Sequence, residues 1–258
     1  MNEDDKIPFT SHLEELRRRL IICFIAVAIG FAAAYGFKEY LFEILVRPLK
    51  LVMAEGDTLI YTNLPEAFFT YLKVAFLTGI GLASPVIIYQ FWMFVAPGLY
   101  EKEKRLLLPI VFLSTLFFVG GALFGYFIVF PYGFKFFLGF ATETIRPMPS
   151  MKEYLSFAAK LLLAFGIVFE LPLVITFMAK LGLVTVPFLK RNRKYAILLF
   201  FVGAAILTPP DVVTQIMMAL PLMLLYEISI IGARIFGRKP LTATDNDDRP
   251  TEETGQAE

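Results

Sequence analysis

The chain contains several runs of apolar residues that are long enough to cross a lipid bilayer. Leu20 to Phe37, Val74 to Pro97 and Leu106 to Pro131 contain no charged residue at all. A helix needs about 20 apolar residues to cross a hydrocarbon core about 30 Å thick. Hydrophobic residues make up 57% of the chain and charged residues only 18%, unlike the composition of soluble domains. We therefore expect an integral membrane protein.

Three further apolar segments bring the predicted spans to six. The fourth, from about Tyr154 to Ala179, contains charged residues, and the last two, Tyr195 to Leu207 and Val212 to Ile231, flank a rigid Thr-Pro-Pro-Asp turn. As a helix, Tyr195 to Leu207 reaches only about 20 Å, so the bilayer must thin or water must enter if this segment crosses. The sequence thus predicts an all-α membrane protein with six transmembrane helices, the last two short.

The distribution of Lys and Arg predicts the orientation. Cations are concentrated before the first span, between spans two and three, between spans four and five, and after span six. By the positive-inside rule, both termini are expected in the cytoplasm. A cleaved signal peptide is disfavoured, because a long segment with acids as well as bases precedes the first span. We divide the chain into an N-terminal amphipathic segment (1–19), a six-helix membrane domain (20–231) and a mostly disordered acidic tail (232–258).

Several classes of function are disfavoured by the residues that the chain contains. A net charge of +1 and the lack of a phosphate-binding loop argue against a nucleic-acid partner. The single cysteine, Cys23, cannot form an internal disulfide or a CxxC metal site. The only histidine, His12, precedes the first span, and Asp211 is the only aspartate that could lie at membrane depth. We therefore expect no enzyme activity, no cofactor and no metal.

Two polar features of the sequence have both a structural and a functional interpretation. Ser11 and Glu14 fit a helix-capping box, and Glu15 and Arg19 have the spacing of an ion pair along a helix. From spacing alone, a capped surface helix is favoured over a binding site.

The outward loop after the first span contains an amphipathic segment that is expected to lie on the membrane surface and to end near Pro48.

Glu170 lies in the middle of the fourth apolar span, in the stretch FGIVFELP. It is ten residues from both Lys160 and Lys180, and a charge at that depth costs at least about 2.5–3.5 kcal/mol. Pro172 leaves the carbonyl of Val168 without its helical partner, which kinks the helix and exposes a second polar group. A functional role is favoured over a protonated acid that serves only packing. A secondary transporter that uses Glu170 as a proton or cation site remains an alternative.

Four motifs follow one another along the chain: SHLEELRRRL at the N-terminus, FWMFVAPGLYEKEKR between spans two and three, FGIVFELP in span four and LTPPDVVTQ at the hairpin. In this order they resemble the TatC family of twin-arginine protein translocase subunits. The resemblance implies a glove-shaped six-helix receptor for twin-arginine signal peptides in the bacterial inner membrane. It further implies transport of folded proteins driven by the proton-motive force, the single-span partners TatA and TatB, surrounding lipid, and several copies in the complex.

The resemblance also assigns roles to residues of this chain. Signal-peptide binding is expected at Glu15, Arg17, Phe94 and Glu103, because paired carboxylates can bind two guanidinium groups. Glu170 would face the concave side of the glove and contact an inserted peptide or partner helix. The remaining expected residues are partner-contact or structural positions, namely Pro48, Thr208, Asp211 and Gln215.

Overall fold

The computed structural model describes residues 9–54, 56–95, 107–142, 144, 146–208 and 211–237. In chain order its helices are α1 (Phe9–Tyr35), α2 (Lys38–Lys50), α3 (Glu66–Val95), α4 (Leu107–Phe124), the π-helical turn η4 (Gly125–Val129), α5 (Phe130–Leu138), α6 (Met151–Val168), α7 (Leu171–Lys180), α8 (Val186–Arg191), α9 (Arg193–Leu207) and α10 (Val212–Phe236). Among the described residues, the only extended pairing is a single bridge between Ile60 and Ser150. The all-α prediction is therefore confirmed.

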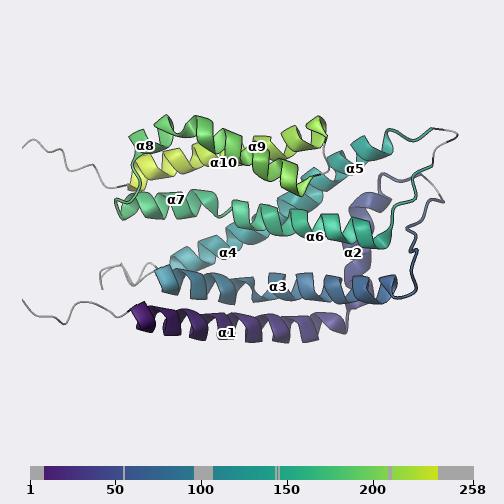
Figure 1. The fold of residues 1–258 in the computed structure, drawn as a ribbon, viewed down its shortest axis with the longest axis horizontal. Coiled ribbons are helices and arrows are strands. Elements are labelled where there is room, and N and C mark those ends of the chain that lie inside the picture. The colour runs from purple at the N-terminus through teal and green to yellow at the C-terminus, as the bar shows by residue number, and fades with distance from the viewer. Residues whose placement is uncertain are drawn as a thin grey trace, which may run out of the picture.

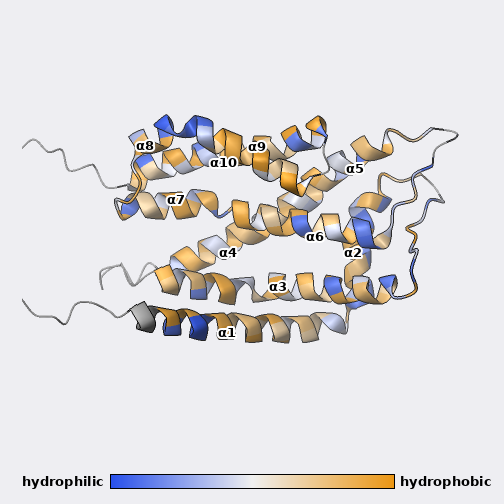
Figure 2. Ribbon diagram, viewed as in Figure 1, coloured by the Kyte–Doolittle hydropathy of each residue, from blue (hydrophilic) through white to orange (hydrophobic). Residues whose placement is uncertain are grey.

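The long helices form a bundle in which α1 begins and α10 ends at the same end (Figure 1). We call this the terminal end, and we call the opposite end, which α2 crosses, the α2 end. Figure 2 shows apolar residues along the helices and polar residues at the start of α1, in α8 and at the start of α9. The chain is therefore organised as a multi-pass membrane protein, with its polar segments at the two ends of the bundle.

Within the described part of the chain, five segments are long and apolar enough to span a membrane. They are Leu13–Tyr35, Glu66–Val95, Leu108–Leu138, Met151–Lys180 and Val212–Phe236. The remaining predicted span, the fifth along the chain, is α9, whose 15 residues reach about 22 Å, so its predicted shortness is confirmed. The sixth predicted span, α10, extends past its predicted end at Ile231 to Phe236 and, with 25 residues, reaches about 37 Å, so the prediction that this helix is also short is wrong.

Around each of three prolines in the predicted spans, the helix adjusts to the missing backbone N–H in a different way. The run that was predicted to end at Pro131 instead continues as α5, because the π-helical turn η4 widens the helix directly before this proline. At Pro85, inside α3, the Ser84 hydroxyl donates to the carbonyl of Gly81 at 2.7 Å, the group that lacks a helical donor. The predicted break at Pro172 is confirmed, since α6 ends at Val168 and α7 starts at Leu171.

The first helix packs along α3 at a very close crossing (Figure 1). A Cβ atom added at Gly30 would lie 2.7 Å from the carbonyl oxygen of Gly79, and one added at Gly79 would lie 2.7 Å from the backbone nitrogen of Phe31. Because only glycine lets the two backbones approach this closely, the pair fixes the position of α1 on α3.

The helix α1 begins at Phe9, so Ser11 lies inside it and the predicted N-cap at Ser11 is wrong.

The amphipathic helix that the sequence predicts on the membrane surface is α2, which buries Leu45, Val46, Pro48 and Leu49. It runs on to Lys50, so Pro48 lies within the helix rather than at its end. Pro48 cannot donate to the carbonyl of Ile44, and the Tyr126 hydroxyl donates to that carbonyl at 2.5 Å instead. A side chain from η4 thus replaces the missing helical donor.

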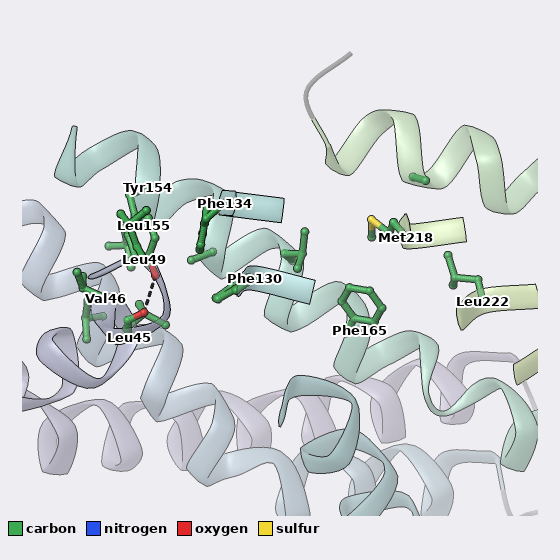
Figure 3. Close-up of a cluster of buried hydrophobic side chains, with 14 residues drawn as sticks. Leu45, Val46, Leu49, Phe130, Phe134, Tyr154, Leu155, Phe165, Met218 and Leu222 are labelled. Atoms are coloured by element: carbon green, nitrogen blue, oxygen red, sulfur yellow. Dashed lines mark hydrogen bonds between the residues drawn. The ribbon is translucent and has the colours of Figure 1, made fainter. Parts of the chain in front are cut away.

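The main apolar core lies against α2. Figure 3 shows Leu45, Val46 and Leu49 of α2 grouped with Tyr154 and Leu155 of α6. The dashed line marks the Tyr154 hydroxyl donating to the carbonyl of Leu45 at 2.5 Å. The core continues through Phe130, Phe134 and Phe165 to the α10 residues Met218 and Leu222 (Figure 3). Burial of α2 therefore connects the outer loops to the helix bundle.

Two loops at the α2 end are held together by the carboxylate of Glu66, which is only 6% exposed. Its Oε1 accepts hydrogen bonds from the Ser150 hydroxyl at 2.7 Å and the Lys152 backbone N–H at 3.1 Å. Its Oε2 accepts from the backbone N–H of Thr62 at 2.9 Å. Ser150 and Lys152 stand at the start of α6, and Thr62 precedes α3, so one carboxylate satisfies unpaired donors at the beginnings of two helices.

Candidate functional site

At the terminal end, α1 and α3 carry a cluster of polar side chains centred on Arg19. The Arg19 Nε donates to Glu15 Oε1 at 3.0 Å, and Nη2 donates to the same oxygen. The ion pair predicted from the spacing of these residues is therefore confirmed. Arg19 Nη1 also donates to Gln90 Oε1 of α3 at 3.1 Å. One guanidinium thus joins the Glu15 carboxylate to the neighbouring helix.

Phe94 and Arg17 occupy different positions relative to this cluster. Phe94 is half-buried and follows Gln90 by four residues, so the two residues share one face of α3. The helices α1 and α3 run in opposite directions (Figure 1), so Phe94, one turn after Gln90, and Glu15, one turn before Arg19, both lie one turn nearer the terminal end than the Arg19–Gln90 bond. Arg17 is exposed and is rotated about 200° around α1 from Glu15. The structure therefore brings Phe94 and Glu15 to one side and leaves Arg17 on another.

Glu103 lies outside the described residues. The helix before it, α3, ends at Val95, and the helix after it, α4, starts at Leu107. Both of these ends are at the terminal end of the bundle, where α1 begins (Figure 1).

Glu170 lies at the break between α6 and α7. Its Oε1 is buried and has no hydrogen-bond partner among the described residues. The Ser114 hydroxyl of α4 lies next to this carboxyl group and accepts a hydrogen bond from Trp92 Nε1 at 2.8 Å. Trp92 in turn packs edge-on against Phe177, with ring centroids 4.7 Å apart. Ser114 of α4, which is itself bonded to Trp92 of α3, therefore lies beside the acid, but one oxygen of Glu170 stays unsatisfied.

The polar residues of the α9–α10 hairpin bond within the hairpin. The buried Thr208 hydroxyl donates to the carbonyl of Ala204 at 2.9 Å, and Asp211 caps α10 by accepting from the Thr214 N–H at 2.7 Å. The Gln215 side chain donates to the carbonyl of Phe201 at 3.0 Å, joining α10 to α9. These bonds hold the two arms of the hairpin together.

No group of three or more His, Cys, Asp and Glu side chains in the described ranges is placed to hold a metal ion. The arrangement at the terminal end is instead suited to binding a cation. It offers a carboxylate that already accepts two N–H groups from a guanidinium.

Comparison with known proteins decides the family. The family model described as Sec-independent protein translocase protein (TatC) matches residues 11–221. A protein of that name from Desulforapulum autotrophicum is 70% identical over 237 residues, which are 92% of this chain and 88% of the relative. The chain belongs to the TatC family. A TatC protein of Magnetococcus marinus is 50% identical over 240 residues, which are 93% of this chain and 88% of the relative.

Solved TatC structures share the fold. A crystal structure titled as the twin arginine translocase receptor TatC superposes with a TM-score of 0.80 at 46% identity, covering 88% of this chain and 100% of that one. A second crystal structure of the receptor, in DDM, gives a TM-score of 0.79 with the same identity and coverage. The resemblance carried by the four sequence motifs is therefore confirmed, and these comparisons favour a translocase subunit over a secondary transporter.

Three polar residues that the sequence analysis did not select have central positions in this TatC fold. Gln90 binds Arg19, Ser114 lies beside Glu170, and Glu66 joins the two outer loops. For Gln90 and Ser114 a signal was present, since each is a polar residue inside an otherwise apolar span. Glu66 stands at a span boundary, where an acid in the first helical turn is common and points to no particular partner.

Proposed function

We propose that the chain is the signal-peptide receptor and core subunit of a twin-arginine translocase, which exports folded proteins by using the proton-motive force. The observation that carries this proposal is the guanidinium already bound to Glu15, because a carboxylate that is placed to hold Arg19 is also placed to hold an arginine of a signal peptide. Membership of the TatC family supports the same function.

Recognition of two adjacent arginines requires a second carboxylate. Glu103 supplies it, on the segment that joins α3 to α4 at the terminal end of the bundle. Phe94 lies level with Glu15 and offers an aromatic face to a guanidinium or to an apolar residue of the peptide. Arg17 is on the other side of α1 from Glu15 and does not contact the peptide in this proposal. Its charge contributes to the electrostatic field around the two carboxylates. Lysine cannot reproduce the planar fork of arginine, which explains a preference for Arg-Arg.

The terminal end faces the cytoplasm in this proposal, and the membrane is the bacterial inner membrane. The positive-inside rule supports this orientation, because α1, α7, α8, α9 and α10 present a larger group of cations at the terminal end than the α2 end presents. The described cations at the terminal end are Arg17, Arg18, Arg19, Lys180 at the end of α7, Lys190, Arg191, Arg193, Lys194 and Arg234, and those at the α2 end are Lys38, Arg47, Lys50, Lys73, Lys135, Arg146 and Lys152.

Single-span TatA and TatB subunits are the proposed partners, and they pack against the α9–α10 hairpin. The apolar side chains of α9 support this surface, since Leu199 is 67% exposed and Ile206 is 75% exposed. The half-buried Gln215 is accessible to a partner helix, whereas the buried Thr208 acts through the shape of the hairpin. Several copies of the chain take part in the assembled complex.

Glu170 is the proposed contact for an inserted peptide or a partner helix. Its unpartnered Oε1 supports this role, because a buried acceptor that lacks a donor is stabilised when an arriving polar group supplies one.

The receptor function is tested by measuring binding of a precursor that bears an Arg-Arg signal peptide to membranes that contain each variant. Glu15→Ala and Glu103→Ala should each weaken binding about tenfold or more, since each removes a charge-assisted bond worth about 1.5–3 kcal/mol. Glu14→Ala is the matched control, because Glu14 is an exposed acid in the same turn of α1 and should leave binding unchanged. Crosslinkers beside Glu15 should capture the Arg-Arg precursor and not its Lys-Lys counterpart. Unchanged binding by both Glu15→Ala and Glu103→Ala would place the receptor site elsewhere.

A further inference from the structure

An apolar cavity of about 420 Å³ lies between α2, α3, the α4–η4 segment and α6. Leu41 and Ile44 of α2, Leu77 of α3, Phe118 of α4 and Leu162 of α6 contribute to its walls. Thr78 and Tyr126 carry the only polar side-chain atoms in its lining. The Tyr126 hydroxyl is already bonded to the carbonyl of Ile44 at 2.5 Å, so the cavity offers little polar recognition inside.

The cavity lies in the half of the bundle nearer α2. On α3 its lining extends from Val74 to Gly81, which are eight and fifteen residues after the helix start at Glu66. At 1.5 Å per residue these positions are about 12 and 22 Å along a helix about 45 Å long. The cavity is therefore at the depth of the acyl chains of the leaflet on the α2 side.

A cation stands at the rim of this cavity. Arg47 is exposed and lies three residues after Ile44, on the same face of α2. Ile44 and Tyr126 both line the cavity and are joined by a hydrogen bond, so Arg47 follows the lining of α2 by one helical turn. No acid in the described part of the chain forms an ion pair with Arg47. An apolar cavity thus opens next to an arginine that forms no ion pair with the described residues.

We propose that this cavity binds a phospholipid of the α2-side leaflet, with one acyl chain inside the cavity and the phosphate on Arg47. Arginine suits this role because its guanidinium binds phosphate through two hydrogen bonds, and cations at helix ends reach naturally to the headgroup level. An apolar cavity of this size loses dispersion contacts when empty, and the acyl chain is the apolar group present at highest concentration around it.

The length of the cavity argues against a partner helix as its occupant. Its lining covers only Val74 to Gly81 of α3, about 10 Å along the helix axis, whereas a partner helix that crosses the bilayer would lie against α3 over about 30 Å. A flexible hydrocarbon chain enters such a space without moving the surrounding helices.

Photolabelling tests the lipid site in the full chain, reconstituted in phosphatidylethanolamine vesicles that contain phosphatidylglycerol with a diazirine in one acyl chain. In the parent, labels should map to residues 74–81 and 118–127. Gly81→Leu should abolish this labelling, because a Cβ at Gly81 meets no atom within 4 Å and the side chain fills the cavity without moving the backbone. Gly120→Leu is the matched control, since a Cβ there also meets nothing within 4 Å but Gly120 does not line the cavity.

The headgroup contact is tested separately. Arg47→Gln should reduce labelling by the phosphatidylglycerol probe about tenfold, to the level given by a diacylglycerol with the same diazirine chain. Lys50→Gln, which removes an exposed cation near the end of α2, should not reduce it. Inorganic phosphate at millimolar concentration should not compete, because it lacks the chain.

Three results would overturn the proposal. Equal labelling of the parent and Gly81→Leu would show that the cavity is not the site. Equal labelling by diacylglycerol and phosphatidylglycerol would remove the phosphate contact. Loss of labelling when an Arg-Arg precursor saturates the protein would assign the cavity to the signal peptide instead of a lipid.

Discussion

The carboxylate of Glu66 is expected to hold the two outer loops together, and Glu66→Gln tests this with little change in volume. In the protein, the two oxygens accept hydrogen bonds from Thr62, Ser150 and Lys152. In Gln one oxygen becomes an NH₂ group, which can only donate. The Ser150 hydroxyl can rotate to accept from it, but the backbone N–H groups of Thr62 and Lys152 cannot. Whichever way the amide points, one backbone donor loses its acceptor.

The size of the effect follows from these contacts. An unsatisfied buried N–H costs about 1–3 kcal/mol, and each remaining bond becomes weaker because the acceptor is no longer charged. Together these losses should lower the local stability of the loop pair by about 2–4 kcal/mol. Ser150, the N-cap residue of α6, makes no side-chain cap bond that could offset the loss.

Hydrogen exchange of the protein in nanodiscs measures this loss directly. Amides of residues 57–63 and 146–152 should exchange about 30-fold faster or more in Glu66→Gln, since 1.36 kcal/mol corresponds to a factor of ten. Glu153→Gln is the matched control, because Glu153 is an exposed acid in the first turn of α6 and should change exchange only slightly. Exchange in Glu66→Gln equal to that of the parent would refute the role assigned to the carboxylate.

Three further outcomes are expected. Glu170→Gln should retain much more precursor export than Glu170→Ala if polarity at this buried position is what matters; equal loss would point to the ionised form, and no loss would favour a packing role. Gly79→Ala should lower the unfolding temperature in detergent, corresponding to about 1–3 kcal/mol, because its Cβ would clash with the backbone of α1, whereas Gly120→Ala should not lower it. A reporter fused after Phe236 should be cytoplasmic and one inserted next to Asp211 extracytoplasmic; a cytoplasmic signal from both would mean that the hairpin re-enters the membrane.

Much of the candidate site was predictable because its signals are local in sequence. The Glu15–Arg19 pair follows from a spacing of four residues on one helix. The break beside Glu170 follows from the missing N–H of Pro172, which acts within one turn. The position of Ser11 was not predicted correctly, since the helix start depends on residues that precede the capping pattern.

The sequence by itself determined the all-α class, the approximate limits of the spans and the short α9. In lipid, the backbone of an apolar run finds hydrogen-bond partners only within its own helix. The length and composition of each run are therefore enough to predict a helix and its approximate limits. Only the tertiary structure decided which helices meet. The contact of Gly30 with Gly79, the bond from Arg19 to Gln90 and the binding of two helix starts by Glu66 each join residues far apart in the chain. Lipid is as apolar as the helix surfaces, so hydrophobicity does not select these pairings; close packing and polar contacts between particular side chains do.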